Sequence, residues 1–226
     1  DELYSLKSKY WLGRSFFAIK KFDDALDQYK DFIKKNISKK IEEYKRVNYD
    51  IAYSYFQLKE YSYALLNFQS FSANKKVLDT KIYNDIDLRI ADCHFALKSY
   101  WPAMEGYNKI IYLNSNKTPY AIYQKAISYG FVDRNVKKIE TLKLLIKEFY
   151  NSFYTDDALF ELAMTLSFET KYDESITYYD KILNDFQKSP YFLKSKLNKG
   201  LILYNQGLYK KSRLLLEELV KKNKSS

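Results

Sequence analysis

The only place where a thiol and an imidazole lie close in the sequence is the Cys93-His94 dipeptide. A cysteine nucleophile needs a base that faces its sulfur, but neighbouring residues on a helix point about 100° apart. One histidine and one cysteine also fall short of the four ligands that a structural zinc site requires. We therefore expect His94 to be a helix-packing residue, and we predict no catalytic residue, no metal site and no cofactor.

Four pairs of adjacent carboxylates are the other candidates for acid–base chemistry. Each pair falls where a helix is expected to begin, and the positive end of a helix dipole favours negative side chains there. Glycosidase-type catalysis needs two carboxyl groups in a cleft with separated pKa values, which this spacing does not favour. The sequence therefore predicts that the protein is not an enzyme. The four pairs are Asp23-Asp24, Glu42-Glu43, Asp156-Asp157 and Asp173-Glu174.

The charge of the 226-residue chain is positive overall but changes sign along its length. Lys and Arg number 38 against 28 Asp and Glu, for a net charge of +10. Residues 1–150 carry 26 basic and 18 acidic side chains, residues 151–186 carry 2 and 8, and residues 187–226 carry 10 and 2. The acidic segment interrupts the continuous positive track that a nucleic acid backbone would follow. We therefore disfavour nucleic acid as a partner and keep single-stranded RNA as a minor alternative.

Glycine and proline are scarce in this chain. Only 5 Gly and 3 Pro occur, too few turn formers for a β-sandwich or β-barrel of this length. Apolar residues make up 46% and aromatic residues 18%, which is enough for a packed core. No apolar run approaches the roughly 18 residues that a membrane-spanning helix needs. We expect a helical protein without a transmembrane segment.

A repeat of about 37 residues runs through the whole sequence. Aromatic residues mark it at positions 22, 61, 100, 172 and 209, and Val136 marks a degenerate unit between the third and the fourth of these. Apolar positions around each marker step by three and four, which is the helical period. Small residues such as Gly13, Ala25, Ala163 and Gly200 recur where two paired helices would approach most closely. Each unit therefore reads as an antiparallel helical hairpin.

One such hairpin cannot bury its apolar face alone, but stacked hairpins can. We predict an all-α fold, a right-handed α-solenoid of about six antiparallel helix-turn-helix repeats. We expect one superhelical domain over residues 1–226, and we expect it to be part of a longer protein. The predicted units are 4–38, 43–77, 82–117, 119–152, 154–189 and 190–226.

Two short patterns recur within these units. One is a small residue with an aromatic residue three positions later, as in Ala52 and Tyr55. The other opens the second helix and is seen in Tyr61, Ala64 and Phe68. Together they resemble the tetratricopeptide repeat (TPR) family over essentially the whole chain. The resemblance implies a noncatalytic scaffold that binds a protein or peptide partner on a concave face formed by the first helix of each unit.

The junctions between units give a second resemblance. Thr118 precedes Pro119, Ser189 precedes Pro190, and Thr155 precedes two aspartates, so we predict all three as helix N-caps. Junctions of this kind are similar to those of bacterial cell-envelope TPR proteins, such as the Tol-Pal coordinator and the barrel-assembly lipoprotein. The similarity implies association with an envelope assembly or secretion system, in the periplasm or cell envelope, with the cytoplasm as the alternative compartment.

The TPR resemblance also indicates which residues would line the concave surface. Tyr and Arg dominate them, and these residue types concentrate binding energy in protein interfaces. The family's carboxylate clamp is missing, because its positions hold Tyr10, Arg14 and Asp50, so we exclude a receptor for chaperone tails. The predicted partner-binding residues are Tyr10, Arg14, Phe17, Tyr49, Tyr53, Phe56, Arg89, Tyr120, Tyr123, Phe160, Met164 and Tyr204. The other inward positions are Lys7, Arg46, Asp85, Asp92, Phe95, Gln124, Phe131, Asp157, Glu161, Phe168, Lys194, Asn198 and Leu201.

Two alternatives to a binding groove remain open. With 24 Tyr in the chain, compositional bias would place aromatic residues on faces that bind nothing. The protein would then be a purely structural subunit that docks through the edges of its repeats or through the basic C-terminal end, where Lys210 and Lys211 lie.

Overall fold

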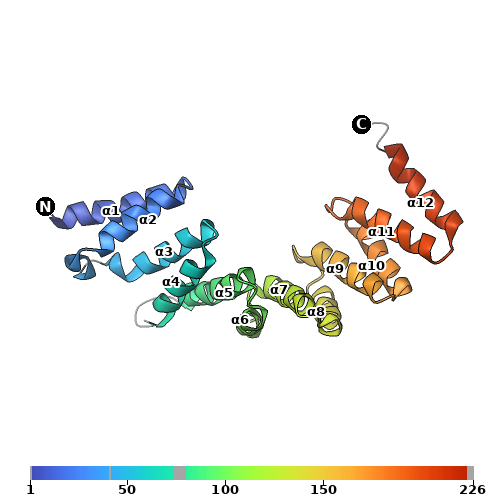
Figure 1. The fold of residues 1–226 in the computed structure, drawn as a ribbon, viewed down its shortest axis with the longest axis horizontal. Helices are drawn as coiled ribbons and strands as arrows, with labels where there is room; N and C mark the ends of the chain where they lie inside the picture. Colours follow the sequence, from blue (N-terminus) through green and yellow to red (C-terminus); the bar gives the residue numbers. More distant parts are fainter. Residues whose placement is uncertain (1, 41, 74–79, 223–226) are drawn as a thin grey trace. The chain divides into compact units, whose positions relative to one another are not determined.

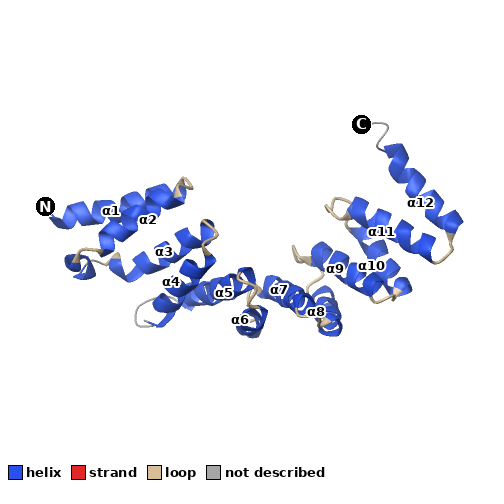
Figure 2. Ribbon diagram, in the orientation of Figure 1, coloured by secondary structure: helices blue, strands red, loops and turns tan. Residues whose placement is uncertain are grey.

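The computed structural model describes residues 2–40, 42–73 and 80–222, and these ranges are helical with short connections and no strand (Figures 1 and 2). One short 3-10 helix, η1, covers Asn36–Lys40. The α-helices are α1 (Glu2–Ala18), α2 (Phe22–Ile33), α3 (Tyr44–Gln57), α4 (Tyr61–Ala73), α5 (Thr80–Ala96), α6 (Tyr100–Tyr112), α7 (Thr118–Phe131), α8 (Asn135–Glu148), α9 (Thr155–Phe168), α10 (Tyr172–Asp185), α11 (Phe192–Asn205) and α12 (Tyr209–Lys222).

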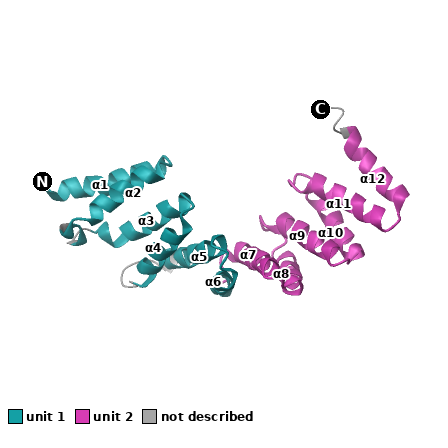
Figure 3. Cartoon of the chain, viewed as in Figure 1, with its two compact units in different colours: residues 1–112 teal, residues 113–226 magenta. Residues whose placement is uncertain are grey.

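The helices pack as sequential hairpins in two compact units, Asp1–Tyr112 and Leu113–Ser226 (Figure 3). Unit 1 contains the pairs α1/α2, α3/α4 and α5/α6, and unit 2 contains α7/α8, α9/α10 and α11/α12. Within a unit, the second helix of one hairpin packs on the first helix of the next. The prediction of an all-α fold of paired helices is confirmed. The single domain and its handedness stay predictions, and the expected unit ends at residues 77 and 226 lie outside the described ranges.

Small residues lie at the helix crossings, as the sequence predicts. A Cβ atom on Gly13 would lie 2.6 Å from the ring of Tyr29 in the partner helix, and one on Gly200 would lie 2.6 Å from Leu216. Neither distance leaves room for a side chain, because real Cβ atoms do not come this close to other heavy atoms. A larger residue at either position would force the facing side chain or the helix to shift.

Serine replaces alanine at the second crossing position in the last two hairpins. The buried Ser175 hydroxyl donates a hydrogen bond of 2.7 Å to the carbonyl oxygen of Ala163. The Ser212 hydroxyl donates one of 2.8 Å to Gly200 in the same way. Both serines thus keep the helices close and satisfy a buried hydroxyl across the hairpin.

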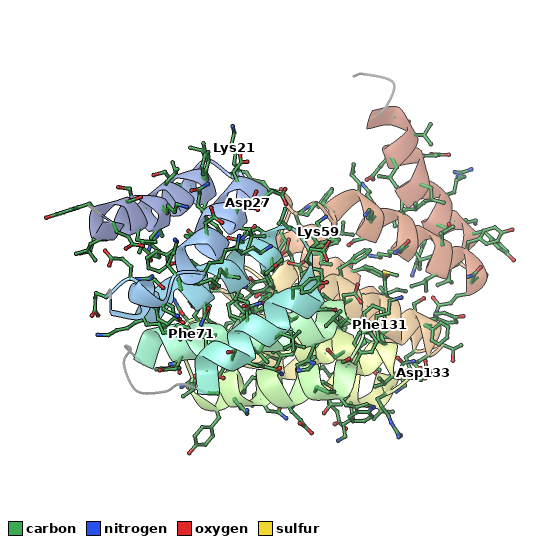
Figure 4. All side chains as sticks on the ribbon, turned by 60° about the vertical axis from the view of Figure 1, so that its left-hand side comes forward. Lys21, Asp27, Lys59, Phe71, Phe131 and Asp133 are labelled. Atoms are coloured by element: carbon green, nitrogen blue, oxygen red, sulfur yellow. The ribbon has the colours of Figure 1, made fainter. Side chains whose placement is uncertain are left out.

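The turn between the two helices of each hairpin contains one residue with a positive φ angle. This left-handed conformation ends the first helix, and glycine adopts it with the least strain. Gly207 takes this role in the last hairpin with φ of 75°. Figure 4 labels two of the other five, Lys59 and Asp133. The five are Lys20 (63°), Lys59 (63°), Lys98 (60°), Asp133 (54°) and Thr170 (57°).

The N-cap prediction for Thr118, Thr155 and Ser189 is wrong. Thr118 and Thr155 are the first residues inside α7 and α9, and α11 begins three residues after Ser189. In each junction the hydroxyl that accepts a backbone hydrogen bond belongs to a serine three residues before the helix, and in the last junction this serine is Ser189 itself. Its Oγ accepts a hydrogen bond from the backbone N–H two residues later, and this occurs in Ser115–Lys117 (3.2 Å), Ser152–Tyr154 (3.3 Å) and Ser189–Tyr191 (3.1 Å).

The Cys93-His94 pair lies on α5 in unit 1. Cys93 is fully buried in a core cluster with Ala52, Phe68 and Ile86, and burial raises its pKa to about 12. His94 is half-buried, and desolvation lowers its pKa. Within the described ranges, no three His, Cys, Asp or Glu side chains come together in a way that could hold a metal ion. None of the described helices is long and apolar enough to span a membrane.

Candidate functional site

The residues predicted to bind a partner differ widely in their exposure. Tyr10 and Phe160 are buried, whereas Met164 and Tyr204 are exposed. The other eight are half-buried, namely Arg14, Phe17, Tyr49, Tyr53, Phe56, Arg89, Tyr120 and Tyr123. Their partner-binding role stays a prediction, and the contacts they make inside the protein show which of them are already engaged.

In unit 1 the positions of the missing carboxylate clamp form an internal network. The Tyr10 hydroxyl on α1 donates a hydrogen bond of 2.7 Å to the Asp50 carboxylate on α3. Arg14 in turn lies 3.4 Å from the Tyr10 oxygen. Burial raises the pKa of Tyr10 to about 12 and also raises the pKa of Asp50. This network connects the first helices of two successive hairpins.

A second network joins the second and third hairpins of unit 1. The Tyr53 hydroxyl on α3 donates a short hydrogen bond to Asp85 on α5, and the Tyr49 hydroxyl donates one of 3.2 Å to the same carboxylate. Arg89 donates to the Tyr53 oxygen at 3.1 Å and to Asp92 at 2.8 Å. Two tyrosines and one arginine predicted to face a partner are therefore bound to acidic residues of the protein itself.

Several other predicted residues form aromatic contacts across a hairpin turn. Each of them lies five residues before the aromatic marker of its unit. Its ring meets the ring of that marker edge to face. The ring centroids lie between 5.2 and 5.7 Å apart. The pairs are Phe17–Phe22, Phe56–Tyr61, Phe95–Tyr100 and Tyr204–Tyr209.

The fourth and fifth hairpins depart from this arrangement. In the fourth, the marker is the aliphatic Val136, which cannot pair rings with Phe131 five residues before it. In the fifth, the residue five positions before Tyr172 is Ser167, which has no ring. A surface hollow lies beside each substituted turn, of about 390 Å³ at Phe131 and about 350 Å³ at Ser167.

The hollow at Ser167 lies between α9 and α11 and has a neutral lining. Its exposed apolar side chains are Met164 (44% exposed), Phe168 (79%) and Leu201 (48%). Asn198 and Asn205 also line it, and the Asn198 amide donates to the Tyr179 hydroxyl at 3.1 Å. We call the surface formed by these five lining residues, Met164, Phe168, Asn198, Leu201 and Asn205, the apolar groove.

The hollow at Phe131 lies beside the apolar groove along α9. Phe131 is 58% exposed, and Figure 4 labels it at the end of α7. Two charged residues line this hollow, but they pair with each other, because Lys138 Nζ lies 2.8 Å from Glu161. Asn135 also donates a hydrogen bond of 2.7 Å to Glu169. Charge is thus largely neutralised within this part of the surface.

The remaining predicted residues of unit 2 pack against its junctions. Tyr123 stacks on Tyr154 at a centroid distance of 6.0 Å, and Tyr120 lies 5.4 Å from the same ring. Phe160 stacks on Tyr191 at 4.6 Å. The Tyr191 hydroxyl donates a hydrogen bond of 2.7 Å to Asp157. These aromatics therefore connect successive hairpins.

The apolar groove can hold apolar side chains, and its asparagine amides can hydrogen-bond to a peptide backbone. Met164, Phe168, Asn198 and Leu201 stand at inward positions that the sequence indicates. Sequence reasoning missed Ser167 and Asn205 as lining residues. The sequence did contain a signal for Ser167. Among the five units with an aromatic marker, only the fifth hairpin has no ring five residues before its marker.

Comparisons with known proteins agree with this architecture. The family model described as "Tetratricopeptide repeat" matches residues 7–36 and 157–189, which overlap the first and fifth hairpins. None of the curated proteins compared with the chain matches it significantly.

Three solved structures share the fold at low sequence identity. The C-terminal part of a TPR repeat-containing protein from Cytophaga hutchinsonii matches with a TM-score of 0.75 and 13% identity, over 94% of this chain and 78% of that one. A tetratricopeptide repeat protein from Parabacteroides merdae matches with a TM-score of 0.69 and 11% identity, over 96% and 80%. MamA from Desulfovibrio magneticus matches with a TM-score of 0.66 and 11% identity, over 82% and 97%.

The helical hairpins, the small residues at their crossings and the two matched repeats lead to one assignment. The chain is a repeat protein of the tetratricopeptide fold.

Proposed function

We propose that the protein is a noncatalytic interaction scaffold and that the apolar groove of unit 2 holds an apolar segment of a protein partner. The observation that carries the proposal is the exposure of Phe168, Met164 and Leu201 around one hollow. Burying the exposed part of these three side chains contributes about 25 cal/mol per Å² of apolar surface, which favours the binding of a partner. None of the described residues that line the groove is charged, which favours an uncharged stretch of the partner.

The groove is a better candidate than the aromatic residues of unit 1. There, Tyr10, Tyr53 and Arg89 already form hydrogen bonds with acidic residues of the protein. A partner that bound to them would have to replace these bonds before it gained any binding energy. Met164, Phe168 and Leu201 require no such exchange.

A photo-crosslinking phenylalanine analogue tests the proposal. Placed at position 168 in cells of the source organism, it is expected to capture a partner. The double variant Met164→Glu with Leu201→Glu should abolish the capture, because it places two charges in an apolar site. Leu144→Glu is the matched control, since Leu144 on α8 is 47% exposed against 48% for Leu201. Capture that persists in the double variant would remove the groove from consideration.

A second candidate role is docking through α12, the last helix. Leu214 and Val220 on this helix are each 59% exposed, and Lys210 and Lys211 near its start are also exposed. Reversing both lysines to glutamate should weaken assembly through this helix and leave crosslinking from position 168 unchanged. Loss of capture at position 168 would show that the two surfaces are not separate.

We also propose a place in a bacterial envelope assembly or secretion system, in the periplasm or cell envelope. The support for it is the resemblance of the Ser189-Pro190-Tyr191 and Thr118-Pro119-Tyr120 junctions to those of envelope TPR proteins. Fractionation of the source cells tests the compartment, and recovery of the protein with the cytoplasmic fraction would contradict the proposal.

A further inference from the structure

One face of α9 connects the apolar groove to an acidic hollow. Asp157, Glu161, Met164 and Phe168 are separated by four, three and four residues, a spacing that places them on one stripe of a helix. Asp157 lines a hollow of about 760 Å³ at the start of the helix. Glu161 lines the middle hollow, and Met164 and Phe168 line the apolar groove at its end.

The first hollow has apolar walls and acidic groups. It is formed by the junctions before α9 and α11, where Phe153 (85% exposed), Phe186 and Pro190 provide the apolar surface. Three carboxylates line it, namely Asp156, Asp157 and Asp185. The exposed Lys188 is the only basic residue among the described lining residues.

Within the described part of the chain, the negative charge of this hollow is offset only by the positive end of the α9 dipole and by the exposed Lys188. No Lys or Arg there forms an ion pair with Asp156, Asp157 or Asp185. Asp157 and Asp185 accept hydrogen bonds from neutral tyrosines, at 2.7 and 2.5 Å. Burial, together with the nearby charges of Asp156 and Glu161, raises the pKa of Asp157. A cation in this hollow would relieve that repulsion.

We infer that the partner segment of the proposed function carries basic residues at one end and apolar residues at the other. The basic end meets Asp156, Asp157 and Asp185, and the apolar end enters the groove at Met164 and Phe168. Phe153 adds an exposed ring, on which the alkyl stem or cationic group of an arginine can lie. This inference rests on the proposed function, because it names the chemistry of the partner that the same surface binds.

The length of α9 sets the spacing between the two ends. Asp157 and Phe168 are eleven residues apart, which is about 16 Å along a helix at a rise of 1.5 Å per residue. An extended peptide advances about 3.3 Å per residue and covers this distance in about five residues. The apolar anchor of the partner is therefore expected about five positions along the chain from its basic group.

Fluorescein-labelled synthetic peptides test this inference. Each has a Gly/Ser background with an Arg-Arg pair and a Leu-Phe pair separated by two, five or nine residues, in both chain directions. We expect one direction of the five-residue peptide to bind about tenfold more tightly than its Glu-Glu counterpart, and to weaken as salt is added. Equal binding of the Arg-Arg and Glu-Glu peptides, or affinity that does not depend on the spacing, would overturn the inference.

Variants of the protein assign the effect to the acidic hollow. The double variant Asp156→Asn with Asp185→Asn keeps the size of both side chains and should reduce binding of the Arg-Arg peptide to that of the Glu-Glu peptide. The control is Asp23→Asn with Asp27→Asn on α2, where both carboxylates are exposed (Figure 4 labels Asp27). A similar loss of affinity in this control would point to a general charge effect and contradict a defined site.

The same experiment separates failure of the inference from failure of the proposed function. If both peptides bind equally and Met164→Glu abolishes both, the groove stands and the acidic hollow is not part of the site. If no peptide with a Leu-Phe pair binds, neither the groove nor the basic end of the partner is supported.

Discussion

The hydroxyl of Tyr10 on α1 donates a hydrogen bond of 2.7 Å to the buried carboxylate of Asp50 on α3. Tyr10 is 2% exposed, and its ring also packs against Tyr29 and Phe32 at centroid distances of 5.9 and 5.6 Å. Tyrosine commonly binds partners, but Tyr10 connects two hairpins of the protein itself. Its contribution is therefore expected to appear in stability.

Removing the hydroxyl tests this role. Tyr10→Phe keeps the ring and leaves the buried Asp50 carboxylate without its tyrosine donor. We expect a loss of about 1–3 kcal/mol in the free energy of unfolding, because an unsatisfied buried acceptor loses its full solvation. Urea unfolding followed by circular dichroism measures it. Tyr4→Phe is the control, since Tyr4 is 69% exposed, and an equal loss in that variant would contradict the assignment.

The buried Asp50 also predicts how stability depends on pH. Burial raises its pKa above the value in the unfolded chain, so the folded state takes up this proton more readily. The contribution of Asp50 to stability is then greatest in acid and falls as the pH rises through the raised pKa. Relative to Asp50→Asn, the wild type should lose stability as the pH rises from about 4, the ordinary pKa of an aspartate, through the raised pKa of Asp50. A constant difference between the two proteins over this range would show that Asp50 does not titrate in this way.

Arg89, which the sequence predicted to bind a partner, is likewise expected to contribute to the stability of the fold. Its guanidinium donates to Asp92 at 2.8 Å and lies 3.8 Å from Asp85. Arg89→Met leaves both carboxylates without this cation, and we expect a loss of about 3–5 kcal/mol in the free energy of unfolding. The matched variant is Arg213→Met, whose exposed pair with Glu217 should contribute less than about 1 kcal/mol. Thermal unfolding of the two variants compares them directly.

The sequence predicts the hairpins well because their determinants are local. The position of a small residue such as Gly13 or Gly200, and the step of three and four between apolar residues, fix both the helices and their crossings. These features need no knowledge of the neighbouring unit. The helix starts were less accurate, because a hydroxyl at Thr118 and one at Ser115 satisfy similar rules and only the backbone geometry decides between them.

The exposure of individual aromatic residues could not be predicted in the same way. Tyr10 and Met164 both stand at inward positions of a first helix, yet one is 2% and the other 44% exposed. The difference depends on what lies opposite. The buried Tyr10 donates a hydrogen bond to Asp50 of the next hairpin, whereas Met164 borders an open surface hollow. A repeat pattern gives the face of a helix but not the contacts that a neighbouring hairpin makes with it.

The left-handed turn residues predict a stabilising substitution. Lys59 has a φ of 63°, a conformation that glycine adopts without the strain of a Cβ atom. We expect Lys59→Gly to raise the free energy of unfolding by about 0.5–1 kcal/mol, as a C-terminal helix cap. Lys109→Gly, inside α6, should lower it by about 1 kcal/mol because glycine weakens a helix interior. Destabilisation by Lys59→Gly would mean that the lysine side chain makes a contact that outweighs the strain.

At the crossing of α11 and α12, we expect the removal of a glycine to destabilise the protein. A Cβ atom on Gly200 would lie 2.6 Å from Leu216 Cδ2 and 2.9 Å from Cγ, so the helices or the leucine must shift. We expect Gly200→Ala to destabilise the protein by about 1–3 kcal/mol, the usual range for an overpacked core.

Gly130→Ala in α7 is the matched control, because the nearest atoms are the flexible end of Lys138 at 3.1 Å. That variant should gain up to about 1 kcal/mol from helix propensity. If Leu216→Ala relieves the effect of Gly200→Ala in a double-mutant cycle, the two residues define the close approach of these helices; strict additivity would place the strain elsewhere.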